Sequence, residues 1–173
     1  GSYRRVLEAM QTRFASGDFM LGDRPGRGDF GLYGQLTQLA RWDPTPTAVA
    51  VEIAPKVPIW VERMDDLSWL PVDGDTGWAA IDDLDRGTHD LLTEVGRTYA
   101  PFMLANARAL TAGSDEMTCQ IDGREYRQAP FGYQGKCLGW LREAYAALEA
   151  DDRERVDAVL DGTGCEPLVA GAA

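Results

Sequence analysis

Three groups of residues in this chain have types and spacing that could support chemistry. His89 precedes Asp90 and Glu94, and an imidazole beside carboxylates can act as a general acid or base near neutral pH. Cys137 follows Lys136, whose ammonium group could lower the pKa of the thiol and make it a nucleophile. Closely spaced carboxylates could hold a divalent cation. They belong to Asp65, Asp66, Asp82, Asp83 and Asp85.

Each group also has a structural interpretation, which we favour in all three cases. Thr88 can cap a helix whose first turn carries acidic residues. Cys137 shares helical spacing with Leu141 and Tyr145, which is typical of a packing cysteine. The carboxylates lack the spacing of a calcium loop and are interpreted as solvated linker acids. Three cysteines with one histidine lack the spacing of a zinc site. We therefore predict no catalytic residue and no metal site, and rank a hydrolase or redox enzyme built on Cys137 or His89 last.

The composition is that of a soluble globular protein. The 173 residues are 45% hydrophobic, which excludes general disorder. A formal net charge of −11 argues against nucleic acid or anionic lipid as a partner. No uninterrupted apolar run reaches the roughly 20 residues that span a bilayer, and three cysteines fit a reducing compartment. We therefore expect a cytoplasmic protein with neither a nucleic acid nor a membrane as its partner.

Apolar periodicity predicts helices in the first part of the chain. Helical spacing extends over residues 3–14 and ends before a glycine. Residues 30–40 carry no charge and place apolar side chains on every side of a helix, so we expect a central, buried helix. Gly31 and Gly34 within it favour a close approach of neighbouring backbones. Shorter helices are expected at residues 47–54 and 59–67.

A segment with proline, glycine and acidic residues at 71–75 is the best candidate boundary, and it separates residues 1–70 from residues 71–173. In the second part, Asp122-Gly123 predicts a tight turn in a hairpin near residues 117–128. Because an isolated hairpin is marginally stable in water, it must lie on helices. Those helices are expected at residues 88–111, with a kink at Pro101, at 137–148 and at 152–160. The predicted fold class is therefore mostly all-α with one small β-hairpin.

A resemblance to a known family lies in the turn before the uncharged helix, whose sequence is Gly22-Asp23-Arg24-Pro25-Gly26-Arg27-Gly28-Asp29. It resembles the G-x-x-P-[ST]-x-x-D turn that opens the central helix in the C-terminal, all-helical domain of the glutathione transferase superfamily. Pro25, Gly26 and Asp29 match this cap motif, but Gly26 replaces serine or threonine, so half of the reciprocal cap is missing. Residues 54–64 resemble the family's P-x-x-x-x-W-x-x-R helix.

The resemblance covers residues 3–70, and residues 71–173 are similar to the long C-terminal extension of a bacterial transferase-like subgroup. It implies a transferase-like helical bundle from which the N-terminal, thioredoxin-like domain that binds glutathione is missing. Glutathione would be the cosubstrate of the full-length protein, and this fragment would hold no cofactor and be inactive alone. It would contribute the hydrophobic pocket for a small electrophile, with a homodimer as a further expectation. The alternative is a non-catalytic transferase-fold module that binds a protein partner.

Two sets of residues are our candidates for lining a substrate pocket. The first set belongs to the segment that matches the family motif, and the second would form a separate crevice in the extension. The first set is Met10, Phe14 and Tyr33. The second set is Tyr99, Met103, Asn106 and Gln134.

Overall fold

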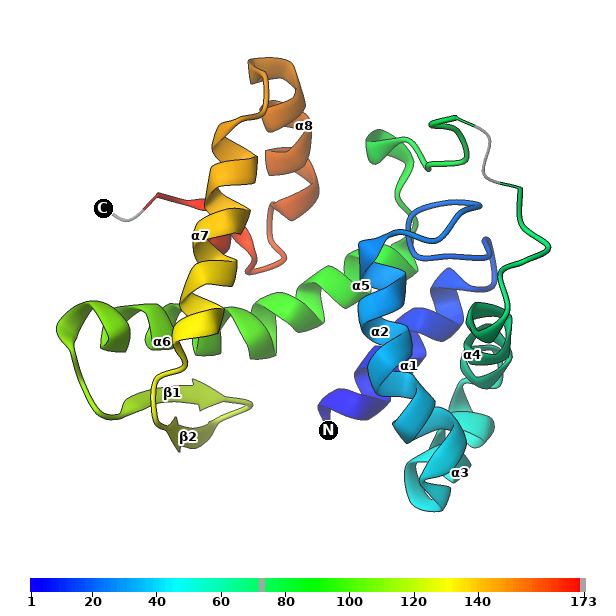
Figure 1. The fold of residues 1–173 in the computed structure, drawn as a ribbon, viewed down its shortest axis with the longest axis horizontal. Coiled ribbons are helices and arrows are strands. Elements are labelled where there is room, and N and C mark those ends of the chain that lie inside the picture. Colours follow the sequence, from blue (N-terminus) through cyan, green and yellow to red (C-terminus); the bar gives the residue numbers. More distant parts are fainter. Residues whose placement is uncertain (72–73, 172–173) are drawn as a thin grey trace. The chain divides into compact units, whose positions relative to one another are not determined.

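The computed structural model describes residues 1–71 and 74–171, and these are mostly helical with one antiparallel pair of strands. This confirms the predicted predominance of helices and the predicted hairpin. The chain divides into two compact units, Gly1–Leu91 and Leu92–Ala173, which we call the first unit and the second unit. Figure 1 traces the chain from the first helix in blue to its last helical turns in red.

The first unit is built from helices α1 to α4, a π-helical turn η1, a 3-10 turn η2 and the larger part of α5 (Figure 1). Their bounds are α1 Ser2–Arg13, α2 Arg27–Thr37, η1 Gln38–Trp42, α3 Pro44–Ile53, α4 Lys56–Asp65, η2 Ile81–Asp83 and α5 Arg86–Glu94.

Apolar side chains of α1, of α4 and of the loop after α1 form the core of the first unit. Phe14 stacks on Trp60 of α4, with ring centroids 5.2 Å apart and planes inclined by 16°. Phe19 and Met20 in the loop are also buried, so this loop is part of the core rather than a loose connection. The remaining large core residues are Leu7, Met10, Leu36, Val57, Val61 and Met64.

Helix α2 does not have the buried environment that its uncharged sequence predicts. Only Asp29 and Leu36 of this helix are buried, while the Phe30 side chain is 53% exposed. Gly31 and Gly34 have open space where a Cβ atom would stand, so no backbone approaches them closely. The prediction of a central, buried helix was therefore wrong for this chain. A lack of charge does not distinguish a helix covered on all sides from one with an uncovered apolar face.

The first unit continues beyond the expected boundary at residues 70 and 71. The Ala79 backbone N–H donates to the Leu21 carbonyl, and the Asp23 N–H donates to the Gly77 carbonyl, both at 2.8 Å. The Arg24 guanidinium lies over the Trp78 ring, 4.8 Å from its centroid. These contacts attach the segment around Trp78 to the loop before α2, which explains why the first unit extends to Leu91.

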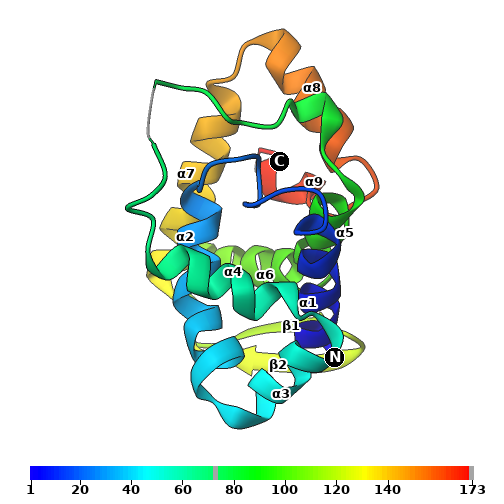
Figure 2. The same ribbon diagram turned by 90° about the vertical axis from the view of Figure 1, so that its right-hand side faces the viewer.

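The second unit consists of helices around a small core, with the hairpin packed on α6 (Figure 2). Pro101, where a kink was expected, lies in the first turn of α6, directly after the π-helical turn η3. A proline there removes no hydrogen bond of α6 itself. The bounds are η3 Val95–Tyr99, α6 Ala100–Ala112, β1 Met117–Ile121, β2 Arg124–Gln128, α7 Gly132–Ala146, α8 Ala150–Leu160 and α9 Glu166–Val169.

The hairpin has the turn that its sequence predicts. Asp122 and Gly123 both have positive φ, 50° and 73°, as a two-residue type I′ turn requires. Cys119 pairs with Tyr126 in the register of the two strands. Met117 is buried beside Ala105 and Ala109 of α6, as expected for a hairpin that needs a helix to support it.

Gly96 of η3 lies in close contact with the backbone of the loop between α8 and α9. A Cβ atom at this position would lie 2.0 Å from the Thr163 carbonyl oxygen and 2.7 Å from the Gly164 carbonyl carbon. Gly164 has a φ of 81°, which favours glycine there as well. The loop between α8 and α9 therefore packs directly on the backbone of η3, and two glycines make this contact possible.

Candidate functional site

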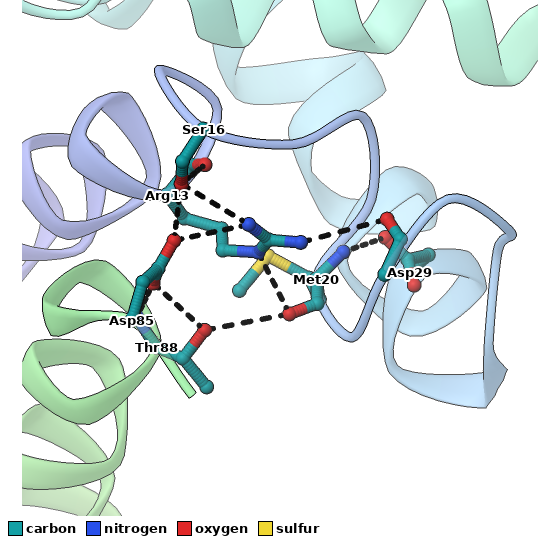
Figure 3. Close-up of polar contacts among 7 residues, drawn as sticks. Arg13, Ser16, Met20, Asp29, Asp85 and Thr88 are labelled. Atoms are coloured by element: carbon teal, nitrogen blue, oxygen red, sulfur yellow. Dashed lines mark hydrogen bonds and ion pairs between the residues drawn. The ribbon is translucent and has the colours of Figure 1, made fainter. Parts of the chain in front are cut away.

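A buried polar cluster lies at the end of α1 in the first unit (Figure 3). Its centre is Arg13, which is 7% exposed although it carries a charge. The Arg13 Nε donates to the Met20 carbonyl at 3.0 Å, and its Nη1 donates to an Asp85 carboxylate oxygen at 3.0 Å. We call this the Arg13 cluster. Its members are Arg13, Ser16, Met20, Asp29, Asp85 and Thr88.

Asp29 links the Arg13 cluster to the start of α2. Its carboxylate accepts the Gly26 N–H and the Met20 N–H, each at 2.9 Å, and the side chain is almost fully buried. Burial raises the pKa of Asp29, although the backbone N–H groups and the positive charge of Arg13 partly oppose this. Gly26 has no side-chain oxygen, so the aspartate arm of the cap is present and the serine or threonine arm is missing.

Asp85 links the same cluster to the start of α5. One Asp85 oxygen accepts the Thr88 N–H at 2.9 Å, so Asp85 is the residue that caps α5. The prediction that Thr88 is the cap was wrong. The other oxygen accepts from the Ser16 hydroxyl and from Arg13. Burial alone would raise the pKa of Asp85, but these hydrogen bonds and the charge of Arg13 lower it overall. The interpretation of Asp85 as a solvated linker acid was therefore wrong.

The polar groups of the Arg13 cluster satisfy one another. Arg13 donates to carbonyls of the loop and to Asp85, and Thr88 donates from its hydroxyl to the Met20 carbonyl at 3.4 Å. A hollow of about 400 Å³ lies beside the cluster, with Ser16, Trp78 and Leu84 among its walls. The cluster thus ties α1, the following loop and α5 together, and this arrangement positions the cap of α2 rather than presenting a reactive group.

The first set of predicted pocket residues lies mainly in the core. Met10 is fully buried, and Phe14 packs against Trp60, so Met10 has no surface to offer a ligand and Phe14 almost none. Tyr33 is half-buried on α2, and its hydroxyl donates to the Asp65 carboxylate. This hydrogen bond raises the pKa of Tyr33. It also engages the hydroxyl proton with Asp65, so that this proton is not available to a bound substrate. Met10 and Phe14 therefore pack in the core of the first unit.

The four residues of the second predicted set have different environments in the structure. Asn106 is fully buried, and it donates to the Phe131 carbonyl at 3.1 Å and accepts the Phe131 N–H at 2.7 Å. It thereby holds the segment before α7. Met103 is a core residue, whereas Tyr99 is partly exposed beside the Phe102 ring. Gln134 lies near the start of α7, with its side-chain oxygen buried.

The described part of the chain contains neither a metal-binding group of side chains nor a helix suited to cross a membrane. Over residues 1–71 and 74–171, no group of three or more His, Cys, Asp or Glu side chains could hold a metal ion. His89 lies in the first turn of α5, and Cys137 lies half-buried in α7. In the same part of the chain, no helix combines the length and the hydrophobicity needed to cross a bilayer.

The second unit contains a cavity that the sequence did not predict. It has a volume of about 400 Å³ and lies between the end of α5, η3, α7, α8 and α9. The signal was present in the helical spacing of Leu141, Tyr145 and Leu148, but periodicity shows which face of a helix is apolar and not whether partners fill it. The lining residues include Leu92, Val95, Leu141, Val156, Leu160 and Cys165.

The motifs that predict a resemblance to transferases lie within residues 3–70, at the cap of α2 and in α4. In the structure, Asp29 of the cap motif accepts the Gly26 N–H within the Arg13 cluster, and Trp60 of the α4 motif stacks on Phe14. No protein-family model, no curated protein and no solved structure matches this chain.

Proposed function

We propose that this chain is the helical part of a glutathione transferase-like protein. In this proposal it contributes binding surface for an apolar acceptor, while another part of the full-length protein binds glutathione. The observation that carries the proposal is the cap of α2. Asp29 is 1% exposed and accepts the Gly26 N–H at 2.9 Å, at the position where the transferase turn has its aspartate. Glycine at a cap costs only a few tenths of a kcal/mol, so this substitution is compatible with the motif.

The motif in α4 supports the same proposal. Trp60 stacks on Phe14 at the end of α1, and Arg63 forms an ion pair with Asp18 in the loop that follows. Both motif residues therefore hold the loop that leads to the cap of α2. A buried aromatic stack is worth about 0.5–1.5 kcal/mol beyond its area of burial, which gives this tryptophan a structural reason.

Retention on immobilised glutathione tests this proposal. We expect the full-length natural protein to bind the resin and to be released by free glutathione. The 173-residue chain alone should pass through and should not accelerate conjugation of a chlorodinitrobenzene, because this proposal assigns activation of the glutathione thiol to another part of the full-length protein. Lack of retention of the full-length protein would contradict the proposal, and so would conjugation by this chain alone.

A second candidate function, self-association as a non-catalytic module, is favoured by the uncovered face of α2 and η1. The Trp42 side chain is 67% exposed, and Phe30 and Leu39 are exposed on the same stretch. The stretch from Phe30 to Ala40 carries no charge, so two copies of a chain with a net charge of −11 can meet here without local repulsion. The bare glycines would let two such helices approach closely in a two-fold arrangement.

Light scattering after size-exclusion chromatography separates this candidate from a monomer. We expect a dimer mass for the native chain at micromolar concentration and a monomer mass for Gly34→Glu, because a buried, unpaired carboxylate is costly in an interface. Gly139→Glu on α7 is the matched control and should leave the dimer intact, since that position also has open space. A monomeric native chain would reject self-association.

A further inference from the structure

The cavity of the second unit has the size of a ligand site. Its volume of about 400 Å³ falls within the range of about 300–1,000 Å³ that is usual for small-molecule pockets. Four helices and η3 contribute to its walls, so it is a concave site rather than the bare face of one helix.

The lining of the cavity carries no charge, and its two polar side-chain atoms are already engaged. The Cys165 thiol donates to the Leu92 carbonyl at 3.2 Å, and burial raises the pKa of this thiol. The Tyr145 hydroxyl donates to the Asp157 carboxylate at 2.6 Å, and this bond raises the pKa of the tyrosine. A ligand in the cavity therefore meets apolar surface and gains little from polar groups of its own.

The charges next to the cavity disfavour an anionic ligand. Arg142 donates to the Leu168 and Pro167 carbonyls, and Arg153 donates through Nη2 to the Ala146 and Leu148 carbonyls, while its Nε is buried without a hydrogen-bond partner. Arg155 is paired with Asp152. Helix α8, which supplies Val156 and Leu160 to the wall, carries four carboxylates against two arginines, Arg153 and Arg155, and is therefore acidic on balance. These carboxylates belong to Asp151, Asp152, Glu154 and Asp157.

We propose that this cavity is a binding site for a neutral, apolar small molecule, such as an aromatic or aliphatic compound without an ionised group. The size of the cavity, its uncharged lining and the acidic helix beside it all point to this chemical class. The site lies within the second unit and is independent of the transferase-like motifs of the first, so it stands or falls separately from the function proposed above.

Two fluorescent probes with the same ring system test the proposal on the chain as it exists. N-phenyl-naphthylamine is neutral, and anilinonaphthalene sulfonate adds one negative charge to the same rings. We expect the neutral probe to bind with a rise in fluorescence, and the anionic probe to bind at least about tenfold more weakly, because its charge would lose water without gaining a partner. Equal affinity for the two probes, or no binding of the neutral one, would overturn the proposal.

A pair of variants locates the binding. Ala144 borders the cavity and Ala146, on the same helix, is not among its lining residues. Ala144→Phe should weaken binding of the neutral probe about tenfold by filling the cavity, and Ala146→Phe should change it less than about twofold. Val156→Leu adds a single methylene to the wall and should lower the affinity in the same direction with little risk to folding. Unchanged affinity in folded Ala144→Phe and Val156→Leu would place the probe elsewhere and reject the site.

Discussion

Replacing Gly96 with alanine is expected to destabilise the second unit by about 3 kcal/mol. The added Cβ would stand 2.0 Å from the Thr163 carbonyl oxygen, a distance that no rotamer change relieves because both atoms are held by backbone. The loop between α8 and α9 would have to move away from η3. Buried Cys165, the last residue of this loop, would then become more exposed. Urea denaturation followed by circular dichroism measures the change in free energy of unfolding.

Gly139→Ala is the matched control for this prediction. Gly139 lies within α7, and no atom outside its own surroundings would approach a Cβ there within 4 Å. Alanine is favoured over glycine in a helix interior by about 1 kcal/mol, so this variant should gain stability. The two Gly→Ala changes are therefore expected to have opposite signs. A Gly96→Ala protein as stable as the native chain would show that the contact with Thr163 is not maintained.

Arg13→Met is expected to destabilise the first unit by about 3–5 kcal/mol. The change keeps most of the side-chain volume but removes the positive charge that faces Asp29 and Asp85 (Figure 3). It also leaves the Met20 carbonyl without the Arg13 hydrogen bond. Arg86→Met is the control, because the Arg86 side chain is 86% exposed and forms one i,i+4 pair with Asp90. That control should stay within about 0.5 kcal/mol of the native chain.

The loss caused by Arg13→Met should shrink in acid. The pKa of Asp85 lies below its usual 3.8 in the folded chain, so the stability that it contributes is present above pH 3.8 and is lost as the pH falls through the folded value. The pKa of Asp29 lies above 3.8, so its protonation on acidification favours the folded state. Once both carboxylates are protonated, the missing guanidinium costs less. Thermal unfolding at pH 7 and below pH 4 measures this, and a gap between the two proteins that widens in acid would contradict it.

Local signals in the sequence predicted much of the fold. Asp122-Gly123 specified its turn because the type I′ geometry needs two residues with positive φ. The cap aspartate Asp29 was identified because its acceptor role depends on residues within one turn. The residue that caps α5 was placed three positions too late, because Thr88 and Asp85 are both good caps and only the loop around Ser16 decides between them.

The candidate site depended on packing between segments distant in the sequence, which the spacing of residues does not specify. Met10 and Phe14 have the helical spacing of pocket residues and of core residues alike, and the stack on Trp60 places Phe14 in the core. Arg13 carries a charge and does not belong to the apolar spacing of residues 3–14, so this spacing does not indicate that the side chain is buried. Its burial depends on Asp85, which lies 72 residues further along the chain. The cavity of the second unit was missed for the same reason.

The division into two units gives each of them its own intrinsic probe. All three cysteines, Cys119, Cys137 and Cys165, belong to the second unit, whereas four of the five tryptophans belong to the first, with Trp140 as the exception. Thiol alkylation therefore reports the opening of the second unit alone, with buried Cys165 as the slowest of the three to react. Tryptophan emission is dominated by the first unit. The order in which the two units unfold can thus be read from the unmodified chain, without attaching a dye to either.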